Sequence, residues 1–257
     1  MPAAAMVLAA GLGTRMRPLT DTRPKPLIKV NGKALIDYSL DLFADAGVSK
    51  AVVNVHYLAD QIEAHVANRQ EPQIIISDER DELLETGGGL LKARDALVEK
   101  QGDGQREKRP VFCTNTDAFL LSEAGEAAFP DPLTSPCGRL ASHWDDARMD
   151  ALLLLVPHAM ASGISSKGDF DMRNDNSIEF RQGESAEYIF TGLQLISPRL
   201  FEGFAVEPFS TKLMWEKAIA KGRLFGLVHP GRWMHVGDPQ GLDEAEAYFR
   251  TTTSQSD

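Results

Sequence analysis

The sequence predicts an α/β protein whose central sheet is mixed and mostly parallel. Two observations support this prediction. Short apolar runs typical of buried strands alternate with amphipathic helical segments along the first half of the chain. The composition, with 43% hydrophobic and 25% charged residues in a chain of 257, is that of a globular protein with a sizeable core. Strands and helices in alternation build right-handed βαβ units, which join into a parallel sheet.

The first half of the chain supplies the alternating elements in order. The first strand is expected at residues 4–9, and an amphipathic helix at 35–46 ends before Gly47. The next elements are expected as a strand at 51–55, a helix at 60–67, a strand at 74–77, a helix at 88–98 and a strand at 111–115. In such sheets, ligands bind beyond the carboxyl ends of the strands. The loop at 9–17 and Asp117 both follow strands, so we expect them to meet there.

The second half of the chain continues with strands at 151–156 and 188–196 and helices at 212–220 and 239–251. Residues 101–109 are polar and rich in helix breakers, which indicates a mobile surface loop. We therefore expect one domain over residues 1–250, followed by a polar tail at 251–257.

The segment after the first strand concentrates positive charge in an acidic protein. The chain has a formal net charge of -10, yet residues 1–33 hold six Lys and Arg residues and one acid, Asp21. Small residues at 9–11 and 13 let backbone N–H groups approach a ligand, and Arg15 and Lys25 add fixed charge around them. This segment predicts a site for a small anionic ligand. Its spacing fits neither the P-loop nor the dinucleotide fingerprint.

The same segment carries a family resemblance. Residues 8–20, Leu-Ala-Ala-Gly-Leu-Gly-Thr-Arg-Met-Arg-Pro-Leu-Thr, followed by Lys25-Pro26, resemble the signature of the sugar-phosphate nucleotidyltransferases. Further motifs follow in the family's order at residues 84–89, 115–117, 168–170, 190–192 and 233–237. They look most like the short uridylyltransferases that act on N-acetylmuramate 1-phosphate in cell-wall recycling. The resemblance implies a Rossmann-like three-layer sandwich of the glycosyltransferase-A type, with a nucleotide-binding half at 1–120 and a sugar-phosphate-binding half at 121–250.

The resemblance also implies roles for individual residues. Arg15 and Lys25 would be the catalytic residues. The nucleotide would be bound by Leu8, Ala9, Ala10, Gly11, Leu12, Gly13, Thr14, Glu85, Gly88 and Asn115. The sugar phosphate would be bound by Gly168, Asp169, Thr191 and Gly192. The start of the helix near Gly88 has a second interpretation, with Thr86 as the N-cap.

The implied reaction explains why the sequence shows no hydrolase-like triad. A sugar phosphate has a second pKa near ~6, by analogy with phosphorylated side chains, so its oxygen attacks without a general base. The reaction needs cations that suppress repulsion between anions and hold them in line. Arg15, Lys25 and Mg²⁺ would supply these.

The metal site departs from the family pattern. Asp117 would bind Mg²⁺, which prefers carboxylates, phosphates and water. The family has a second carboxylate where this chain has His235, and a neutral imidazole is a poorer Mg²⁺ ligand. Three outcomes remain open at this point: Asp238 reaches the metal, water and phosphates complete its shell, or activity is reduced.

Three functions are compatible with these motifs. The leading one is a Mg²⁺-dependent uridylyltransferase that joins UTP and N-acetylmuramate 1-phosphate. The second is a guanylyl- or thymidylyltransferase for a mannose-, heptose- or glucose-type 1-phosphate. The third is a catalytically inactive nucleotide-sugar sensor on the same fold, suggested by His235 and opposed by the intact Arg15 and Lys25.

The remaining composition favours a small-molecule enzyme. The pI near 5.1 argues against binding to nucleic acid, which depends on extended basic surface. The longest apolar run, at 151–156, is too short to cross a bilayer, and no signal peptide is indicated. Two cysteines without metal spacing favour the reducing cytoplasm. We expect a monomer or a small homo-oligomer.

Overall fold

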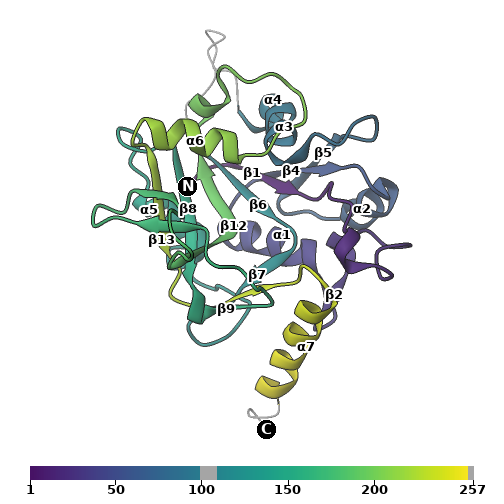
Figure 1. The fold of residues 1–257 in the computed structure, drawn as a ribbon. Coiled ribbons are helices and arrows are strands. Elements are labelled where there is room, and N and C mark those ends of the chain that lie inside the picture. The colour runs from purple at the N-terminus through teal and green to yellow at the C-terminus, as the bar shows by residue number, and fades with distance from the viewer. Residues whose placement is uncertain (99–108, 254–257) are drawn as a thin grey trace.

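The computed structural model describes residues 1–98 and 109–253. Its main sheet has nine strands and runs in the order β11-β10-β12-β6-β1-β4-β5, with β8 paired to β12 and β13 paired to β8 (Figure 1). These strands are β1 Ala4–Leu8, β4 Lys50–Val55, β5 Gln73–Asp78, β6 Val111–Asn115, β8 Ala151–Pro157, β10 Phe170–Met172, β11 Ile178–Phe180, β12 Tyr188–Ile196 and β13 Leu224–Val228.

The sheet is parallel in its first part and mixed in its second. The pairs of β1 with β4, β1 with β6, and β4 with β5 are parallel, as the alternating pattern predicts. β12 is antiparallel to both β6 and β8, and β13 runs parallel to β8. The predicted α/β fold with a mixed sheet is therefore confirmed.

Helices cover both faces of this sheet and make three layers. Successive strand residues point to opposite faces, so Ala5 and Val7 join one core while Ala4 and Met6 join another. The first core lies under α1 Leu35–Asp45, α2 Ala59–Val66 and α5 Pro136–His143. The second lies under α3 Glu85–Lys92, α4 Arg94–Leu97 and α6 Lys212–Ala220 (Figure 1).

Most predicted elements are present within a residue or two of their expected bounds, with one correction. The helix expected at 88–98 begins earlier, at Glu85, and is interrupted at Ala93 between α3 and α4. Thr86 lies inside the first turn and is not the N-cap. Its Oγ1 accepts a hydrogen bond from Thr211 N at 2.9 Å, so the hydroxyl serves a tertiary contact.

The predicted tail and surface loop fall largely outside the described residues. The last helix, α7 Pro239–Thr253, includes the first three residues of the expected tail, and residues 254–257 are not described. The loop expected at 101–109 lies outside the described residues except for Arg109.

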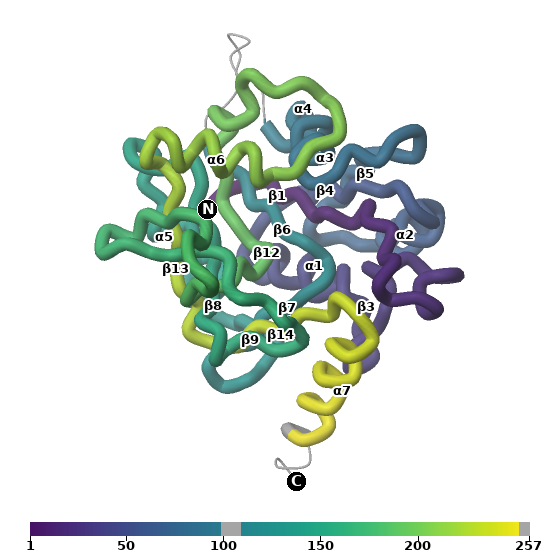
Figure 2. The backbone as a smooth tube through the Cα atoms, in the orientation of Figure 1, coloured from purple at the N-terminus to yellow at the C-terminus, as the bar shows by residue number. Residues whose placement is uncertain are grey.

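Several short elements were not predicted from the sequence. They are β2 Lys29–Val30, β3 Lys33–Ala34, β7 Ala118–Leu120, β9 Ala161–Ser162, β14 Trp233–His235, α5, β10, β11, β13 and the 3-10 turns η1 Thr14–Met16, η2 Lys25–Leu27, η3 His158–Met160 and η4 Pro198–Phe201. β7, β14 and β9 form a small second sheet. A third core beneath α7 includes Met16, Leu35 and Phe119. From there α7 projects away from the body of the molecule (Figure 2).

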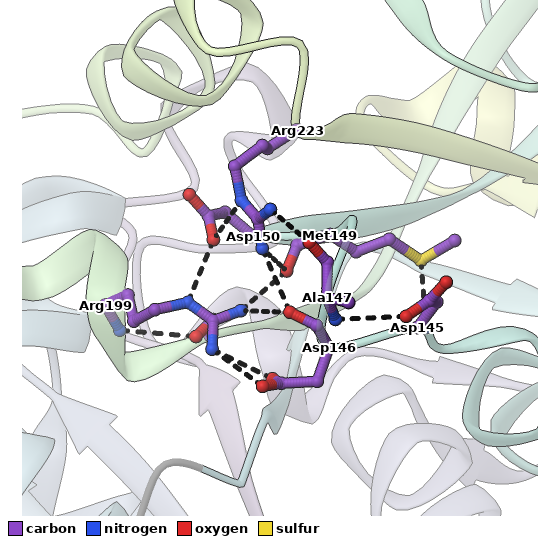
Figure 3. A network of polar contacts seen from close by, with 8 residues as sticks. Asp145, Asp146, Ala147, Met149, Asp150, Arg199 and Arg223 are labelled. Atoms are coloured by element: carbon purple, nitrogen blue, oxygen red, sulfur yellow. Dashed lines mark hydrogen bonds and ion pairs between the residues drawn. The ribbon is translucent and has the colours of Figure 1, made fainter.

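Two arginines join three chain segments on Asp150. The side chain of Asp150 is 4% exposed, and its Oδ1 accepts from Arg199 Nε at 3.0 Å and Arg223 Nε at 2.9 Å (Figure 3). Both guanidinium groups also donate to the carbonyl oxygen of Met149. Burial alone would raise the pKa of Asp150, but the hydrogen bonds and charges of the two arginines lower it below its ordinary value. The network fixes η4 and the starts of β8 and β13.

Candidate active site

A cavity of about 440 Å³ opens at the carboxyl ends of β1 and β6. Its lining includes eleven of the residues assigned to the site from sequence, which are Leu8, Ala9, Ala10, Gly11, Gly13, Thr14, Arg15, Lys25, Glu85, Asn115 and Asp117. The Thr116 hydroxyl donates to the carbonyl oxygen of Leu8 at 2.9 Å and ties the two strand ends together. The predicted meeting of the first loop with Asp117 is therefore confirmed. The predicted Leu12 is exposed and does not line the cavity.

Gly13 closes the loop and brings Lys25 beside it. Its φ of +63° is a left-handed conformation that glycine adopts without a Cβ penalty. A Cβ there would lie 3.0 Å from the Cβ of Lys25 and from Cγ2 of Thr20. The Thr20 hydroxyl donates to the carbonyl oxygen of Gly13 at 2.8 Å and holds the loop shut. The aliphatic part of the Lys25 side chain therefore packs directly against the loop at residues 9–17, which we call the glycine loop.

Lys25 and Asp117 form an ion pair across the cavity wall. Nζ of Lys25 lies 3.2 Å from Oδ2 of Asp117, and their side chains are 13% and 29% exposed. Burial acts to raise the pKa of Asp117, but the His235 hydrogen bond and the charge of Lys25 prevail and hold it well below its usual range. Asp117 is thus a carboxylate at any pH near neutral. Arg15 also lines the cavity, and no acidic side chain among the described residues forms an ion pair with it.

His235 approaches Asp117 from the small second sheet. β14 pairs with β7 so that His235 faces Ala118, the residue after Asp117. Nε2 of His235 lies 3.6 Å from Oδ2 of Asp117, and Nδ1 lies 3.0 Å from the carbonyl oxygen of Gly163. A carbonyl oxygen only accepts, so Nδ1 carries the proton. Gly237 leaves room for this ring, because a Cβ at 237 would lie 2.0 Å from its Cε1.

Asp238 was one candidate for an extra carboxylate at the metal site. Its Oδ1 accepts a hydrogen bond from Gly241 N at 2.9 Å, so it caps the N-terminus of α7. It is absent from the cavity lining. No group of three His, Cys, Asp or Glu side chains suited to hold a metal ion occurs in residues 1–98 and 109–253. Among the described residues, the carboxylates that line the cavity are those of Asp117 and Glu85.

The first turn of α3 forms another wall, with Glu85 and Thr86 in the lining and the predicted Gly88 outside it. Glu85 lines the cavity with a φ of +56°, which is an uncommon left-handed conformation for a residue with a side chain. The N–H groups of Gly87 and Gly88 point elsewhere and donate to the carbonyl oxygen of Phe209 at 2.8 and 3.2 Å. A Cβ on Gly88 would lie 2.1 Å from the carbonyl oxygen of Glu207. These glycines therefore permit close packing against the segment at 207–209.

The residues assigned to the sugar phosphate lie outside this cavity lining. The Thr191 hydroxyl donates to the carbonyl oxygen of Leu154 at 2.9 Å, and Oδ2 of Asp169 accepts from Phe190 N at 2.9 Å. Gly168 packs on the backbone of Ala186, where a Cβ would lie 2.1 Å from the carbonyl oxygen. These contacts shape β12 and its neighbours.

Gly192, another member of that set, packs against a residue of the cavity lining. It has a φ of +94°, and a Cβ on it would lie 3.2 Å from the Cβ of Asn115, which lines the cavity. The residue sits in the irregular stretch of β12 between Phe190 and Gln194, where the pairing with β8 shifts register. The absence of a side chain at Gly192 therefore leaves space for the side chain of Asn115.

Sequence reasoning missed seven residues that line the cavity. They are Pro26, Asn54, Leu83, Thr86, Thr116, Ser210 and Gly237. Asn54 carries a signal in the sequence, because a polar residue interrupts the apolar run of β4 near its carboxyl end. Ser210 carries no such signal, since the segment around Phe209 reaches the cavity only through its contacts with α3.

The fold and this cavity indicate an enzyme that acts on small phosphorylated substrates. Residues 4–123, which hold the glycine loop, Lys25, α3 and Asp117, match the family described as nucleotidyl transferase. A solved structure of an inositol-1-phosphate CTP transferase from T. maritima has the same fold, with a TM-score of 0.71, 18% identity and 96% of each chain covered.

Two relatives match nearly the whole chain. An N-acetylmuramate alpha-1-phosphate uridylyltransferase from Caulobacter vibrioides is 43% identical over 251 residues, which cover 96% of each protein. Another from Neisseria meningitidis serogroup B is 33% identical over 248 residues, which cover 95% of this chain and 96% of the relative. The chain therefore belongs to the nucleotidyl transferase family. The resemblance seen in the sequence is confirmed, and the comparison favours an enzyme over the inactive sensor.

None of the helices in residues 1–98 and 109–253 combines the length and the apolar character needed to cross a bilayer.

Proposed function

We propose that this enzyme transfers the uridylyl group of UTP to N-acetylmuramate 1-phosphate and releases pyrophosphate. The two relatives named for that activity support the proposal, because they match nearly the whole chain. The structural observation that supports it most is the 3.2 Å contact between Lys25 and Asp117, at a cavity that Arg15 also lines. Two cations and an ionised carboxylate suit a reaction between anions that a divalent metal ion assists.

The proposed reaction exchanges one phosphorus–oxygen bond for another. An oxygen of the sugar phosphate forms a bond to the α-phosphorus of UTP, and the bond from that phosphorus to the bridging oxygen of pyrophosphate breaks. The attacking oxygen is already ionised, so no side chain has to accept a proton. Lys25 would hold the α-phosphate and the incoming phosphate together. Arg15 would offset the charge that collects on the leaving pyrophosphate.

Mg²⁺ fits the donor set at Asp117. Mg²⁺ in enzymes keeps several waters and binds through one or two carboxylates plus substrate phosphates. The ionised, partly exposed carboxylate of Asp117 meets that need when the nucleotide supplies the remaining oxygens. When bound, the ion would offset negative charge on the phosphates. We therefore propose Asp117 as its main protein ligand.

The proposed activity also suggests a place in the cell. A uridylylated muramic sugar is an activated form of a cell-wall component, so the enzyme would return this sugar to synthesis during peptidoglycan recycling in the cytoplasm.

Pyrophosphate release tests the proposal directly. The enzyme is assayed with each common nucleoside triphosphate against the 1-phosphates of N-acetylmuramate, N-acetylglucosamine, glucose, mannose and heptose, with and without Mg²⁺. We expect UTP with N-acetylmuramate 1-phosphate to give the highest kcat/KM and to require Mg²⁺. A higher kcat/KM for GTP with a mannose- or heptose-type substrate, or for dTTP with glucose 1-phosphate, would replace this function with the corresponding alternative.

A further inference from the structure

A buried pair of polar side chains, Asn54 and Glu79, extends inward from the cavity lining, to which Asn54 belongs. Asn54 stands near the end of β4 and is 2% exposed, while Glu79 follows β5 and is 0% exposed. Nδ2 of Asn54 donates to Oε1 of Glu79 at 2.8 Å. Burying a carboxylate is costly unless it is hydrogen-bonded, so such a pair needs an explanation.

The outer hydrogen bonds of this pair reach two separate walls of the cavity. Oδ1 of Asn54 accepts from the N–H of Ala9, in the loop after β1, at 2.7 Å. Oε2 of Glu79 accepts from the N–H of Leu84, the residue before α3, at 3.2 Å. A continuous chain of three hydrogen bonds thus spans from the glycine loop to the residue next to Glu85.

The backbone geometry at Glu85 shows what these three hydrogen bonds hold in place. Leu84 is fixed at both ends, because its N–H donates to Glu79 and its carbonyl oxygen accepts from Phe209 N at 3.2 Å. The next residue, Glu85, adopts the left-handed φ of +56° and lines the cavity. A residue in that conformation persists only where its surroundings impose it.

Gly89 shows that α3 is built around the pair. A Cβ on Gly89 would lie 2.7 Å from Oε1 of Glu79 and 2.8 Å from Nδ2 of Asn54. Glycine inside a helix is unfavourable relative to alanine. Its presence here is explained by the closeness of the Asn54–Glu79 hydrogen bond.

We propose that Asn54 and Glu79 are positioning residues that set the separation between the loop at Ala9 and the first turn of α3, and so determine how tightly the cavity fits the nucleotide base. The proposal rests on the proposed function. It gives the pair a role in nucleotide affinity and base selection, and leaves the chemistry at the phosphates to Lys25 and Arg15.

The hydrogen-bond directions allow a sharp test by exchange of the two functional groups. Asn54→Asp removes the amide donor, so the two buried carboxyl groups can hydrogen-bond to each other only when they share a proton. Glu79→Gln leaves two donors facing each other in either amide orientation, because Ala9 N and Leu84 N both donate. The double variant N54D/E79Q restores all three bonds, since the new amide donates to the new carboxylate while both backbone N–H groups keep acceptors.

The measurements are the KM for UTP, kcat, and the inhibition constant of GTP. Each single variant should raise the KM for UTP about tenfold or more, with a smaller fall in kcat, and should change GTP inhibition far less. The double variant should return to within about threefold of the parent. Asn68→Asp and Glu71→Gln make the same chemical changes at exposed positions and should match the parent.

Gly89→Ala gives an independent route if a single variant unfolds below the assay temperature. It leaves both side chains chemically intact but displaces them, and should reduce the preference for UTP over GTP in the same way.

The inference is wrong if the single variants keep the parent KM for UTP, if the affinities for UTP and GTP fall equally, or if the double variant has a KM for UTP no better than that of the worse single variant. A parent that prefers another nucleotide overturns the proposed function instead, and the same comparisons are then made with that nucleotide. A parent without turnover also overturns it, and the calorimetric Kd values of UTP and GTP then replace KM and the inhibition constant.

Discussion

Nε2 of His235 lies 3.6 Å from Oδ2 of Asp117, on a ring whose orientation is set by the carbonyl oxygen of Gly163. By the resemblance seen in the sequence, His235 stands where the family pattern has a second carboxylate. Because Nδ1 donates to Gly163, the nitrogen that faces Asp117 is the one able to present a lone pair or, when protonated, a donor. Compared with a carboxylate at this position, His235 gives Asp117 a polar partner without adding a negative charge.

This arrangement predicts how metal dependence responds to mutation. Asp117→Ala should lose most activity, because it removes the carboxylate that we propose as the main protein ligand of Mg²⁺. His235→Asp should keep or raise activity and lower the Mg²⁺ concentration needed for half the maximal rate, because it restores a second carboxylate. The measurement is the initial rate of pyrophosphate release against Mg²⁺ concentration for the parent and both variants. An Asp117→Ala enzyme with the parent's rate would remove Asp117 from the metal site.

Lys25 provides a second prediction. Lys25→Ala should lower kcat by about 10²-fold or more, because one preorganised cation near the reacting phosphates is removed. UTP binding, measured by calorimetry, should survive in part, since Arg15 and the glycine loop remain. Lys29→Ala is the control, because Lys29 is an exposed cation four residues further along the same segment. Near-parental kcat in Lys25→Ala would contradict the catalytic assignment.

The sequence allowed prediction of the elements that carry local signals. Hydrophobic periodicity and glycine positions are signals that can be read within a few residues. They predict the glycine loop, α1 and the parallel strands β1, β4, β5 and β6. The meeting of the loop at 9–17 with Asp117 was also predictable, because the carboxyl ends of neighbouring parallel strands share an edge.

The remaining features depend on contacts between distant segments. Gly87 and Gly88 look like a ligand loop in the sequence, yet the carbonyl oxygen of Phe209 takes their N–H groups. The hydrogen bonds of Thr191 and Asp169 around β12 likewise join distant segments, and their assignment to the sugar phosphate stays a prediction. Strands as short as β7 and β14 have too few residues to show an alternating hydrophobic pattern. They form because they pair with each other.

Base selection provides a third prediction. If the wall formed by Glu85 and Thr86 accommodates uracil, UTP should bind more tightly than GTP or ATP, because a purine would collide with this part of the cavity. Calorimetric titration of the enzyme with each nucleotide in the presence of Mg²⁺ measures the difference. Equal or tighter binding of GTP would favour the guanylyltransferase alternative.

The last prediction concerns stability at the Asp150 network (Figure 3). Asp150→Asn should lower the free energy of unfolding by about 2–3 kcal/mol, because it weakens charged hydrogen bonds to Arg199 and Arg223. Because the folded-state pKa of Asp150 lies below its unfolded value, its contribution is full above about pH 4–5 and declines as the pH falls through the folded-state pKa. Denaturant unfolding of the parent and variant at pH 7 and at successively lower pH should therefore show a difference that shrinks in acid. Asp243→Asn, at an exposed position of α7, should leave stability unchanged at every pH. A pH-independent difference between the parent and Asp150→Asn would show that side-chain packing, and not the carboxylate charge, accounts for the loss.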